Sequence, residues 1–295
     1  MPAPRLRRVL TVSALAAATL TILSTPAYSA DTSRYVALGD SFVAGPLVPN
    51  QTGSPAGCFR SDSNYPSLVA EQLGVDEFVD VSCSGATTED FFNTQSTPIG
   101  DNDPQLDALA PETTLVSFGI GGNDIGFGEI LLACAGGGAV DPFGTPCQDK
   151  YVDSDTGVDE LRTRIAETRP KVAEVFAEIA TRAPNARVVV AGYPATMPET
   201  EGCWPKVTIA EKDVPYLDGV EQDLNAMLAG TAAAAGATYV DNYQRGHDVC
   251  SPRDDRWVEG IIPTKPAFPV HPNADGMQAM ATNITNTLGS HSPDA

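Results

Sequence analysis

Residues 34–45 read Arg-Tyr-Val-Ala-Leu-Gly-Asp-Ser-Phe-Val-Ala-Gly, and the fold is decided in this stretch. The apolar run from Tyr35 to Leu38 predicts a short buried strand. It stops at Gly39, and Ser41 follows two residues later. Open α/β sheets place their sites beyond the carboxyl ends of the strands, where a following helix directs free N–H groups at the loop. Ser41 is therefore either a nucleophile or only a helix cap.

Working outward, four more short apolar runs predict strands. They cover residues 78–81, 113–118, 187–192 and 237–241. Apolar residues at helical spacing predict helices over residues 65–73, 125–132, 158–182, 216–235 and 273–288. Strands that alternate with helices indicate an α/β fold, a mainly parallel sheet covered by helices on both faces. Residues 46–64, 91–105, 133–150 and 242–272 are expected to be loops. One domain over 31–289 is favoured over a split near 140–155.

The first 30 residues have the organisation of a signal peptide. Three arginines, the first at Arg5, precede an apolar run from Val9 to Leu23, and small residues allow cleavage after Ser29 or Ala30. The apolar run is short for a transmembrane helix, although a retained signal anchor is the alternative. We therefore expect a secreted protein without stable membrane anchoring, followed by a disordered tail over 290–295.

The chain is strongly acidic, with a formal net charge of −20. The leader carries three arginines and no acidic residue, so its removal leaves 15 basic against 38 acidic residues, a net charge of −23. Such a charge opposes binding to nucleic acid and to anionic membrane surfaces. We expect a monomer whose charge serves solubility.

Six cysteines lie beyond the leader, and an even number in an exported chain indicates three disulfides. Sequence alone allows 15 pairings. The sequential one is favoured: Cys58–Cys83, Cys134–Cys147 and Cys203–Cys250. A zinc site is the alternative, but there is no Cys-x-x-Cys pair and the chain has only three histidines. No metal and no cofactor is expected.

The segments after the first three predicted strands carry the candidate chemistry. Gly-Asp-Ser ends at Ser41, Ser-Gly-Ala-Thr contains Gly85, and Gly-Gly-Asn-Asp contains Asn123. Parallel strands bring these segments to one edge of the sheet. Acyl transfer needs a nucleophile and donors for an oxyanion there, and the N–H groups of Ser41 and Gly85 and the amide of Asn123 are suitable donors. Taken singly, Gly85 is explained by a turn and Asn123 by a helix cap.

A serine nucleophile also needs a base, and three histidines compete for that role. His291 lies in the predicted tail, and His247 lies in a loop three residues before Cys250. His271 directly precedes Pro272 and the last predicted helix, where the backbone is fixed. From the residues alone, His247 and His271 both remain candidates for the base.

These four blocks, in this order, resemble the conserved blocks of the SGNH, or GDSL-type, hydrolases. With the leader and cysteines, the chain is most similar to the secreted bacterial lipase, esterase and phospholipase branch. The resemblance implies a three-layer α/β/α, flavodoxin-like fold with a parallel five-stranded sheet. It also implies that Ser41 is the nucleophile, that His271 is the base, and that Ser41, Gly85 and Asn123 form the oxyanion hole.

One departure from the family pattern concerns the acid that orients the histidine. The usual block is Asp-x-x-His, whereas here Phe268 occupies the acidic position before His271. Some members of the branch use a backbone carbonyl instead, and the carbonyls of Phe268 and Pro269 are the candidates. A carbonyl can accept the Nδ1–H bond and select the tautomer. Asp255 or Asp248 remains the alternative as a remote acid.

The resemblance implies hydrolysis of a carboxylic ester through an acyl-enzyme, without a cofactor. Lipid esters are the preferred substrate. A carbohydrate or cell-wall O-deacetylase is the alternative, because the same chemistry removes acetyl groups from sugars. A secreted binding module with an inactive site is the non-enzymatic alternative. Residues 45–49 and the loop after Phe127 are apolar enough to line an acyl pocket. The alternative is that these residues only pack against the rest of the protein as ordinary loop residues.

Overall fold

The computed structural model describes Met1 and residues 33–290 of the 295-residue chain. The predicted signal peptide, apart from Met1, lies outside the described residues, and so do both candidate cleavage positions. The same holds for His291 and for the predicted tail beyond Ser290.

Five parallel strands form the central sheet, in the order β2-β1-β5-β6-β7. They are β1 (Arg34–Gly39), β2 (Glu77–Asp80), β5 (Leu115–Gly119), β6 (Arg187–Ala191) and β7 (Thr238–Val240). The apolar run of β1 pairs on both sides, with Tyr35 opposite Phe78 and Leu115. Because its neighbours cover both edges, β1 is a central strand, as its continuous apolar sequence requires.

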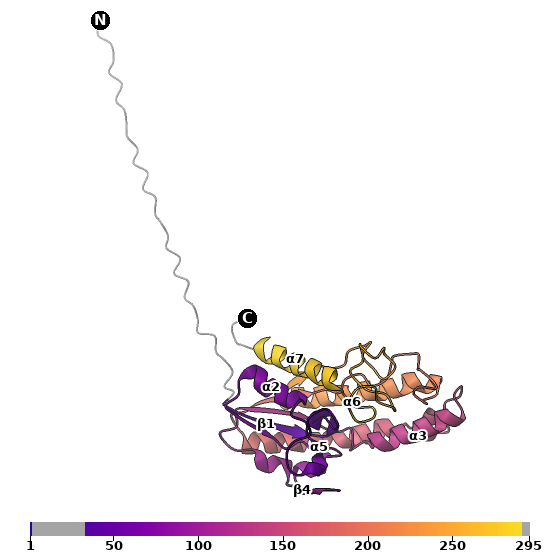
Figure 1. Cartoon of the computed structure of the whole chain (residues 1–295), viewed down its shortest axis with the longest axis horizontal. Coiled ribbons are helices and arrows are strands. Elements are labelled where there is room, and N and C mark those ends of the chain that lie inside the picture. The colour runs from indigo at the N-terminus through magenta and orange to yellow at the C-terminus, as the bar shows by residue number, and fades with distance from the viewer. Residues whose placement is uncertain (2–32, 291–295) are drawn as a thin grey trace.

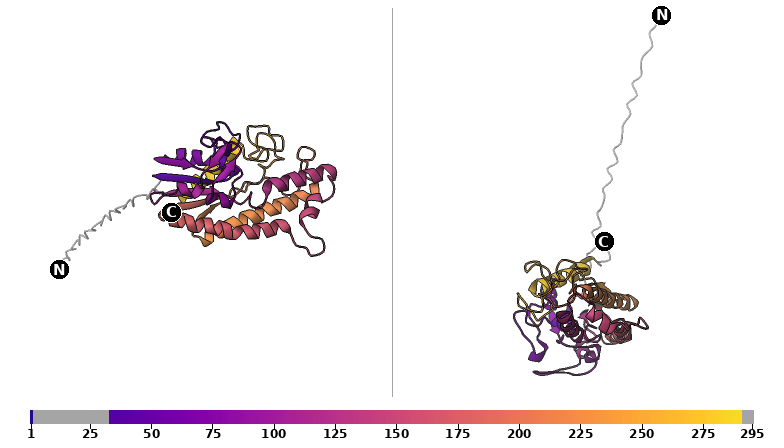
Figure 2. Two further views of the ribbon diagram at one scale, coloured as in Figure 1. Left: turned by 90° about the horizontal axis from the view of Figure 1, so that it is seen from below. Right: turned by 90° about the vertical axis from the view of Figure 1, so that its right-hand side faces the viewer.

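Side chains of β1 alternate between two apolar cores. Tyr35 and Ala37 pack with α2 (Tyr65–Leu73) and α7 (Ala274–Ser290). Val36 and Leu38 pack on the opposite face. The helices of that face are α3 (Phe127–Val140), α4 (Pro146–Tyr151), α5 (Glu160–Arg182) and α6 (Val214–Ala234). Figure 1 shows α2 beside α7, and Figure 2 shows the long helices extending beyond the end of the sheet. This arrangement confirms the predicted three-layer α/β/α fold.

Local signals set most helix boundaries. The Asn64 side chain caps α2 by accepting the Ser67 N–H at 3.0 Å, and Gly74, at φ +63°, ends that helix. Asp159 caps α5, which continues through Pro170 and ends at Arg182. Short 3₁₀ turns occupy Ala56–Cys58, Thr88–Phe91, Gln105–Ala108 and Glu211–Asp213.

The expectation that 91–105 is a loop was wrong. This segment contains a small antiparallel hairpin, β3 (Gln95–Thr97) with β4 (Gly100–Asn102). Its buried positions are polar, so no apolar alternation announces it. Gln95 instead donates to the Ser84 carbonyl at 3.0 Å, and Asn102 donates to the Val81 carbonyl at 3.3 Å.

The expectation that 133–150 is a Gly/Pro loop was also wrong. Helix α3 runs on to Val140, and α4 follows. One glycine inside α3 is explained by close packing, since a Cβ at Gly138 would collide with the backbone of Thr208 and Ala210. A glycine that allows the helix to lie against a neighbouring backbone was thus interpreted as a sign of a loop.

The described cysteines form three disulfides, and all of them are sequential: Cys58–Cys83, Cys134–Cys147 and Cys203–Cys250. Each joins segments outside the central strands, and Cys134–Cys147 joins α3 to α4. Among residues 33–290, no helix combines the length and the apolar character that crossing a membrane would need. Within the same residues, no cluster of three or more histidine, cysteine or acidic side chains could hold a metal ion.

Candidate active site

Ser41 lies at the carboxyl end of β1, as the first residue of the single-turn helix α1 (Ser41–Ala44). The turn before it requires glycine, because Gly39 has φ +139° and a Cβ there would collide with Val43 and with the Gly119 carbonyl. The Asp40 carboxylate caps the turn by accepting the Phe42 N–H at 2.9 Å. In the described part of the chain, the N–H of Ser41 donates to no other group. The turn therefore presents both a hydroxyl and a free N–H at one point.

The Ser41 hydroxyl contacts His271. Ser41 Oγ lies 2.7 Å from His271 Nε2, and His271 Nδ1 lies 2.8 Å from the Pro269 carbonyl oxygen. A carbonyl only accepts hydrogen bonds, so Nδ1 carries the ring proton. Nε2 is then unprotonated and accepts the hydrogen bond from the Ser41 hydroxyl. Of the two carbonyls suggested by the sequence, that of Pro269 orients the ring, whereas that of Phe268 accepts the His271 backbone N–H at 3.2 Å.

The imidazole of His271 lies among aromatic rings. Its centroid is 4.8 Å from that of Phe42, 5.2 Å from that of Phe268 and 6.3 Å from that of Phe127. The residue is only 7% exposed. Burial disfavours the imidazolium and lowers the pKa of His271 to about 4, although the hydrogen bond to the Pro269 carbonyl acts in the opposite direction. The ring is therefore neutral at pH 7 and can accept a proton.

The remaining predicted donors lie in two neighbouring loops. Gly85 has φ +83°, and its N–H, like that of Ser41, has no acceptor among the described residues. Asn123 lines the same cavity as Ser41 and donates one amide hydrogen to the Ala86 carbonyl at 2.9 Å. Since an amide has two N–H donors, one remains available. The bond to Ala86 also ties the Asn123 loop to the Gly85 loop.

The competing residues lie elsewhere. His247 Nδ1 contacts the Asp255 carbonyl oxygen at 2.5 Å, and its ring stacks on Trp257 at 3.8 Å. The Asp248 carboxylate accepts the Cys250 N–H at 2.9 Å. None of these groups touches His271, so neither Asp248 nor Asp255 supplies a carboxylate to its ring.

Sequence reasoning missed Tyr193. The Tyr193 hydroxyl donates to Asp40 Oδ2 at 2.5 Å and accepts the Gly122 N–H at 2.9 Å. It therefore joins the serine turn to the loop that carries Asn123. Burial raises the pKa of the Asp40 carboxyl group to about 7. No local pattern could have indicated Tyr193, which lies 153 residues from Asp40 in the chain.

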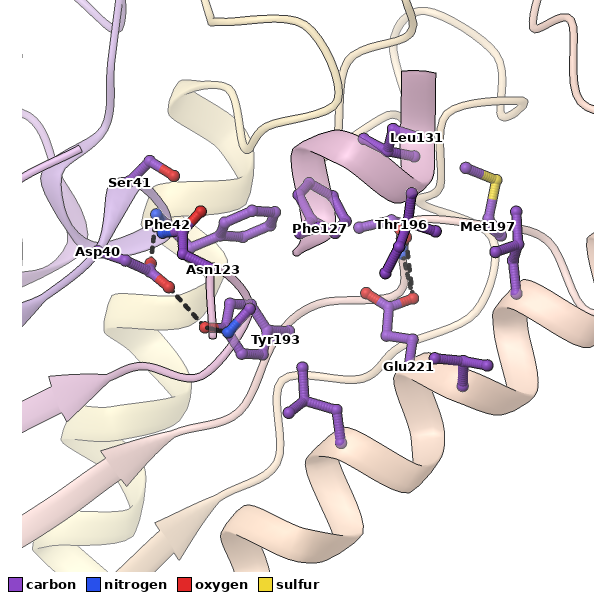
Figure 3. Close-up of a pocket in the computed structure, with 15 residues that line it drawn as sticks. Asp40, Ser41, Phe42, Asn123, Phe127, Leu131, Tyr193, Thr196, Met197 and Glu221 are labelled. Carbon is purple, nitrogen blue, oxygen red and sulfur yellow. Dashed lines mark hydrogen bonds between the residues drawn. The ribbon is translucent and has the colours of Figure 1, made fainter. Parts of the chain in front are cut away.

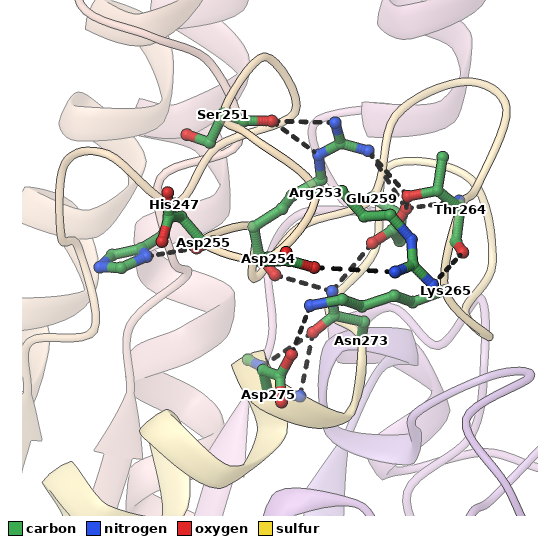
Figure 4. Close-up of polar contacts among 12 residues, drawn as sticks. His247, Ser251, Arg253, Asp254, Asp255, Glu259, Thr264, Lys265, Asn273 and Asp275 are labelled. Atoms are coloured by element: carbon green, nitrogen blue, oxygen red, sulfur yellow. Dashed lines mark hydrogen bonds and ion pairs between the residues drawn. The ribbon is translucent and has the colours of Figure 1, made fainter.

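A buried polar network, also missed, holds the loop that carries His271 (Figure 4). The Glu259 carboxylate accepts hydrogen bonds from Thr264, Asn273 and Arg256, the shortest at 2.7 Å, and its backbone N–H donates to the His271 carbonyl at 3.0 Å. Arg256 and Glu259 are both almost fully buried. Asn273 also caps α7 through the N–H groups of Asp275 and Gly276. The backbone at His271 and just after it is thereby fixed.

Two hollows adjoin the serine–histidine pair. An apolar groove of about 410 Å³ reaches His271. It is lined mainly by hydrophobic side chains of α3 and of the loops 197–209 and 261–271. A smaller cavity of about 50 Å³ reaches Ser41 and Asn123 and extends to α6 (Figure 3). Phe127, Leu131 and Met197 line both hollows, which therefore adjoin each other.

A serine hydroxyl bonded to a neutral histidine at the carboxyl edge of a parallel α/β sheet defines the class of serine hydrolases. The family can be stated more closely. Residues 37–279 match the model of the GDSL-like lipase/acylhydrolase family, and the chain belongs to that family. It is a carboxylic ester hydrolase of the lipase and esterase type.

Individual relatives agree with this assignment. The chain is 38% identical to Lipase 2 of Streptomyces coelicolor, over 98% of this chain and 99% of that protein. It is 30% identical to an esterase of Streptomyces scabiei, over 97% and 95%. Among solved structures, it resembles the extracellular lipase of Streptomyces rimosus (28% identity, TM-score 0.68) and phospholipase A1 of Streptomyces albidoflavus (27%, 0.67). Each of these two matches extends over 87% of this chain and 99% of the chain in the solved structure.

Proposed function

We propose that this protein hydrolyses lipid esters through an acyl-enzyme formed on Ser41. The observation that carries the proposal is the 2.7 Å contact between Ser41 Oγ and His271 Nε2 beside an apolar groove. His271 removes the proton of Ser41 as the hydroxyl attacks the ester carbonyl. The N–H groups of Ser41 and Gly85 and the free amide hydrogen of Asn123 stabilise the oxyanion. His271 then protonates the leaving alcohol and activates water for deacylation.

The proposed catalytic unit is a dyad, with the Pro269 carbonyl in place of the orienting acid. The carbonyl selects the tautomer and fixes the ring, which are two of the tasks of a triad carboxylate. It cannot stabilise the imidazolium as strongly, because it carries no full charge.

Lipid esters are favoured over acetylated sugars because of the groove. Its lining is almost entirely apolar, and about 410 Å³ is more than an acetyl group can fill. The names of the relatives, which include lipases and a phospholipase A1, point the same way. Signal cleavage after Ser29 or Ala30, export, one domain over 31–289 and a monomeric state belong to the same proposal. The extracellular description of the Streptomyces rimosus lipase supports export.

The test is hydrolysis of p-nitrophenyl esters of increasing acyl length by the wild type and by Ser41→Ala. We expect the wild type to prefer medium or long chains and the variant to lose activity by about 10⁴-fold or more. The variant should retain the melting temperature of the wild type, since Ser41 is small and lies at the surface of a cavity. Activity on acetate alone would contradict the lipid proposal, and an active Ser41→Ala would contradict the site.

A further inference from the structure

The small cavity beside Ser41 has a carboxyl group on the wall opposite Ser41. Most of its lining from α3 and α6 is apolar, including Ile130, Val220 and Leu224, but Glu221 of α6 lies among these residues. Figure 3 shows Ser41 and Glu221 on opposite sides of the cavity. A carboxyl group on an apolar wall is unfavourable unless it has hydrogen-bond partners.

Only one oxygen of that carboxyl group is satisfied. Glu221 Oε2 accepts from the Thr196 N–H and from the Thr196 hydroxyl, both at 2.9 Å. Within residues 33–290, Oε1 has no hydrogen-bond partner. In Figure 3 this oxygen is turned away from Thr196 and toward the interior of the cavity. Glu221 is partly buried, so this oxygen is accessible to a group that enters the cavity.

The protonation state of Glu221 determines what the free oxygen offers. Burial raises the pKa of Glu221 to about 8, so the carboxyl group is mostly neutral at pH 7. Because Oε2 accepts two hydrogen bonds, the proton is placed on Oε1. The cavity therefore presents an O–H group that can both donate and accept.

We propose that Glu221 is a specificity-determining residue that binds a hydroxyl group of the ester substrate. This inference rests on the proposed function. A cavity of about 50 Å³ has room for a short hydroxylated segment but not for a fatty chain. The larger apolar groove takes the chain. The favoured substrate thus combines an apolar chain with a short hydroxyl-bearing end close to the ester carbonyl.

The hydroxyl can belong to the alcohol or to the acyl part, and paired substrates separate the two. Glyceryl monobutyrate is compared with propyl butyrate, and ethyl 3-hydroxybutyrate with ethyl butyrate. We expect the wild type to prefer the hydroxylated member of one pair by about tenfold or more in kcat/KM, because a site that binds a hydroxyl discriminates against the analogue lacking it.

Three variants test whether Glu221 causes the preference. In Glu221→Leu, kcat/KM for the hydroxylated ester divided by kcat/KM for its unhydroxylated analogue should fall to near one. Glu221→Gln should retain most of the preference, because the amide N–H₂ can replace the O–H. Asp213→Asn is the matched control, since Asp213 is a buried carboxylate that binds the N–H groups of Cys147 and Gln148 and does not line this cavity. It should lower stability and leave the ratio unchanged.

The inference is overturned if neither pair shows a preference, or if Glu221→Leu keeps the wild-type ratio. In both cases Glu221 would only anchor Thr196. These results are separable from failure of the proposed function. Loss of activity in Ser41→Ala together with an unchanged ratio in Glu221→Leu would reject only the role of Glu221.

Discussion

Among residues 33–290, no carboxylate contacts the ring of His271, and the Pro269 carbonyl orients it for its proposed role. The imidazole lies among Phe42, Phe127 and Phe268, and burial lowers its pKa to about 4. The active form of the base is neutral and is lost as the pH falls through that pKa. The acid limb of the kcat/KM profile should therefore lie near pH 4, well below the 6.5 of an exposed histidine.

Replacing Phe268 tests this electrostatic account. Phe268→Asp introduces a carboxylate beside the imidazole, which favours the imidazolium, raises the pKa of His271 and moves the acid limb up by about one to two pH units. Phe268→Asn has nearly the same shape without the charge and should keep the limb near its wild-type position. Identical pH profiles for the two variants would refute the account.

Asp40 gives a second test, through stability. Its folded-state pKa of about 7 lies above the ordinary value of 3.8, so the folded protein holds a proton that the unfolded chain releases. The contribution of Asp40 to stability is therefore complete below about pH 4 and is lost as the pH rises to about 7. Its slope is at most about 1.4 kcal/mol per pH unit. His271 acts in the opposite direction between pH 4 and 6.5, because the unfolded chain binds more protons there.

In urea unfolding between pH 4 and 8, Asp40→Asn should remove the Asp40 contribution, so its stability relative to wild type increases with pH. Asp76→Asn, at an exposed position, serves as the control. Its free energy of unfolding should differ from that of the wild type by the same amount at every pH. A constant difference for Asp40→Asn as well would contradict the assignment.

At the scale of elements, the loop between β7 and α7 depends on a buried ion pair. Arg256 and Glu259 lie 3.3 Å apart with almost no exposure. Removing one partner leaves the other charge buried and should destabilise the protein by about 3–5 kcal/mol. Replacing both by apolar residues avoids that penalty.

The prediction is a double-mutant cycle with Glu259→Leu, Arg256→Met and the combined variant, measured by denaturant unfolding and by kcat. Each single variant should be much less stable than wild type. The combined variant should recover part of the loss in stability while kcat stays low, because the hydrogen bonds of Glu259 to Thr264 and Asn273 are still missing. If the losses in free energy of unfolding of the two single variants simply added up in the combined variant, the two residues would not be a coupled pair.

The elements also show what sequence can predict and why it stops. Strands β1 and β5 were evident as apolar runs, and the loops with Ser41, Gly85 and Asn123 follow from where such strands end. The hairpin β3–β4 was not evident, because its buried side chains are polar. Tyr193, Glu221 and Glu259 were missed for a related reason. A polar residue with internal hydrogen bonds leaves no periodic signal, and for Tyr193 the partner Asp40 also lies 153 residues away in the chain.

Considered as a whole molecule, the protein carries a formal charge of −20, yet its proposed substrates are lipids. Anionic lipid surfaces should repel it over a distance set by the ionic strength. We expect kcat/KM on substrate in anionic mixed micelles to rise as NaCl is increased from 10 to 150 mM. Uncharged micelles are the control and should show little change. Equal salt responses would indicate that net charge does not govern access to the substrate.

The contact between Ser41 and His271 joins residues separated by 230 positions. During synthesis from the N-terminus, the proposed nucleophile and the proposed oxyanion donors are made long before the proposed base. A nascent chain that has not reached residue 271 therefore holds an unactivated serine, and it cannot attack the esters of the cell that makes it. Placing the base so late in the chain delays the onset of catalysis until the sheet and most of the helices have been translated.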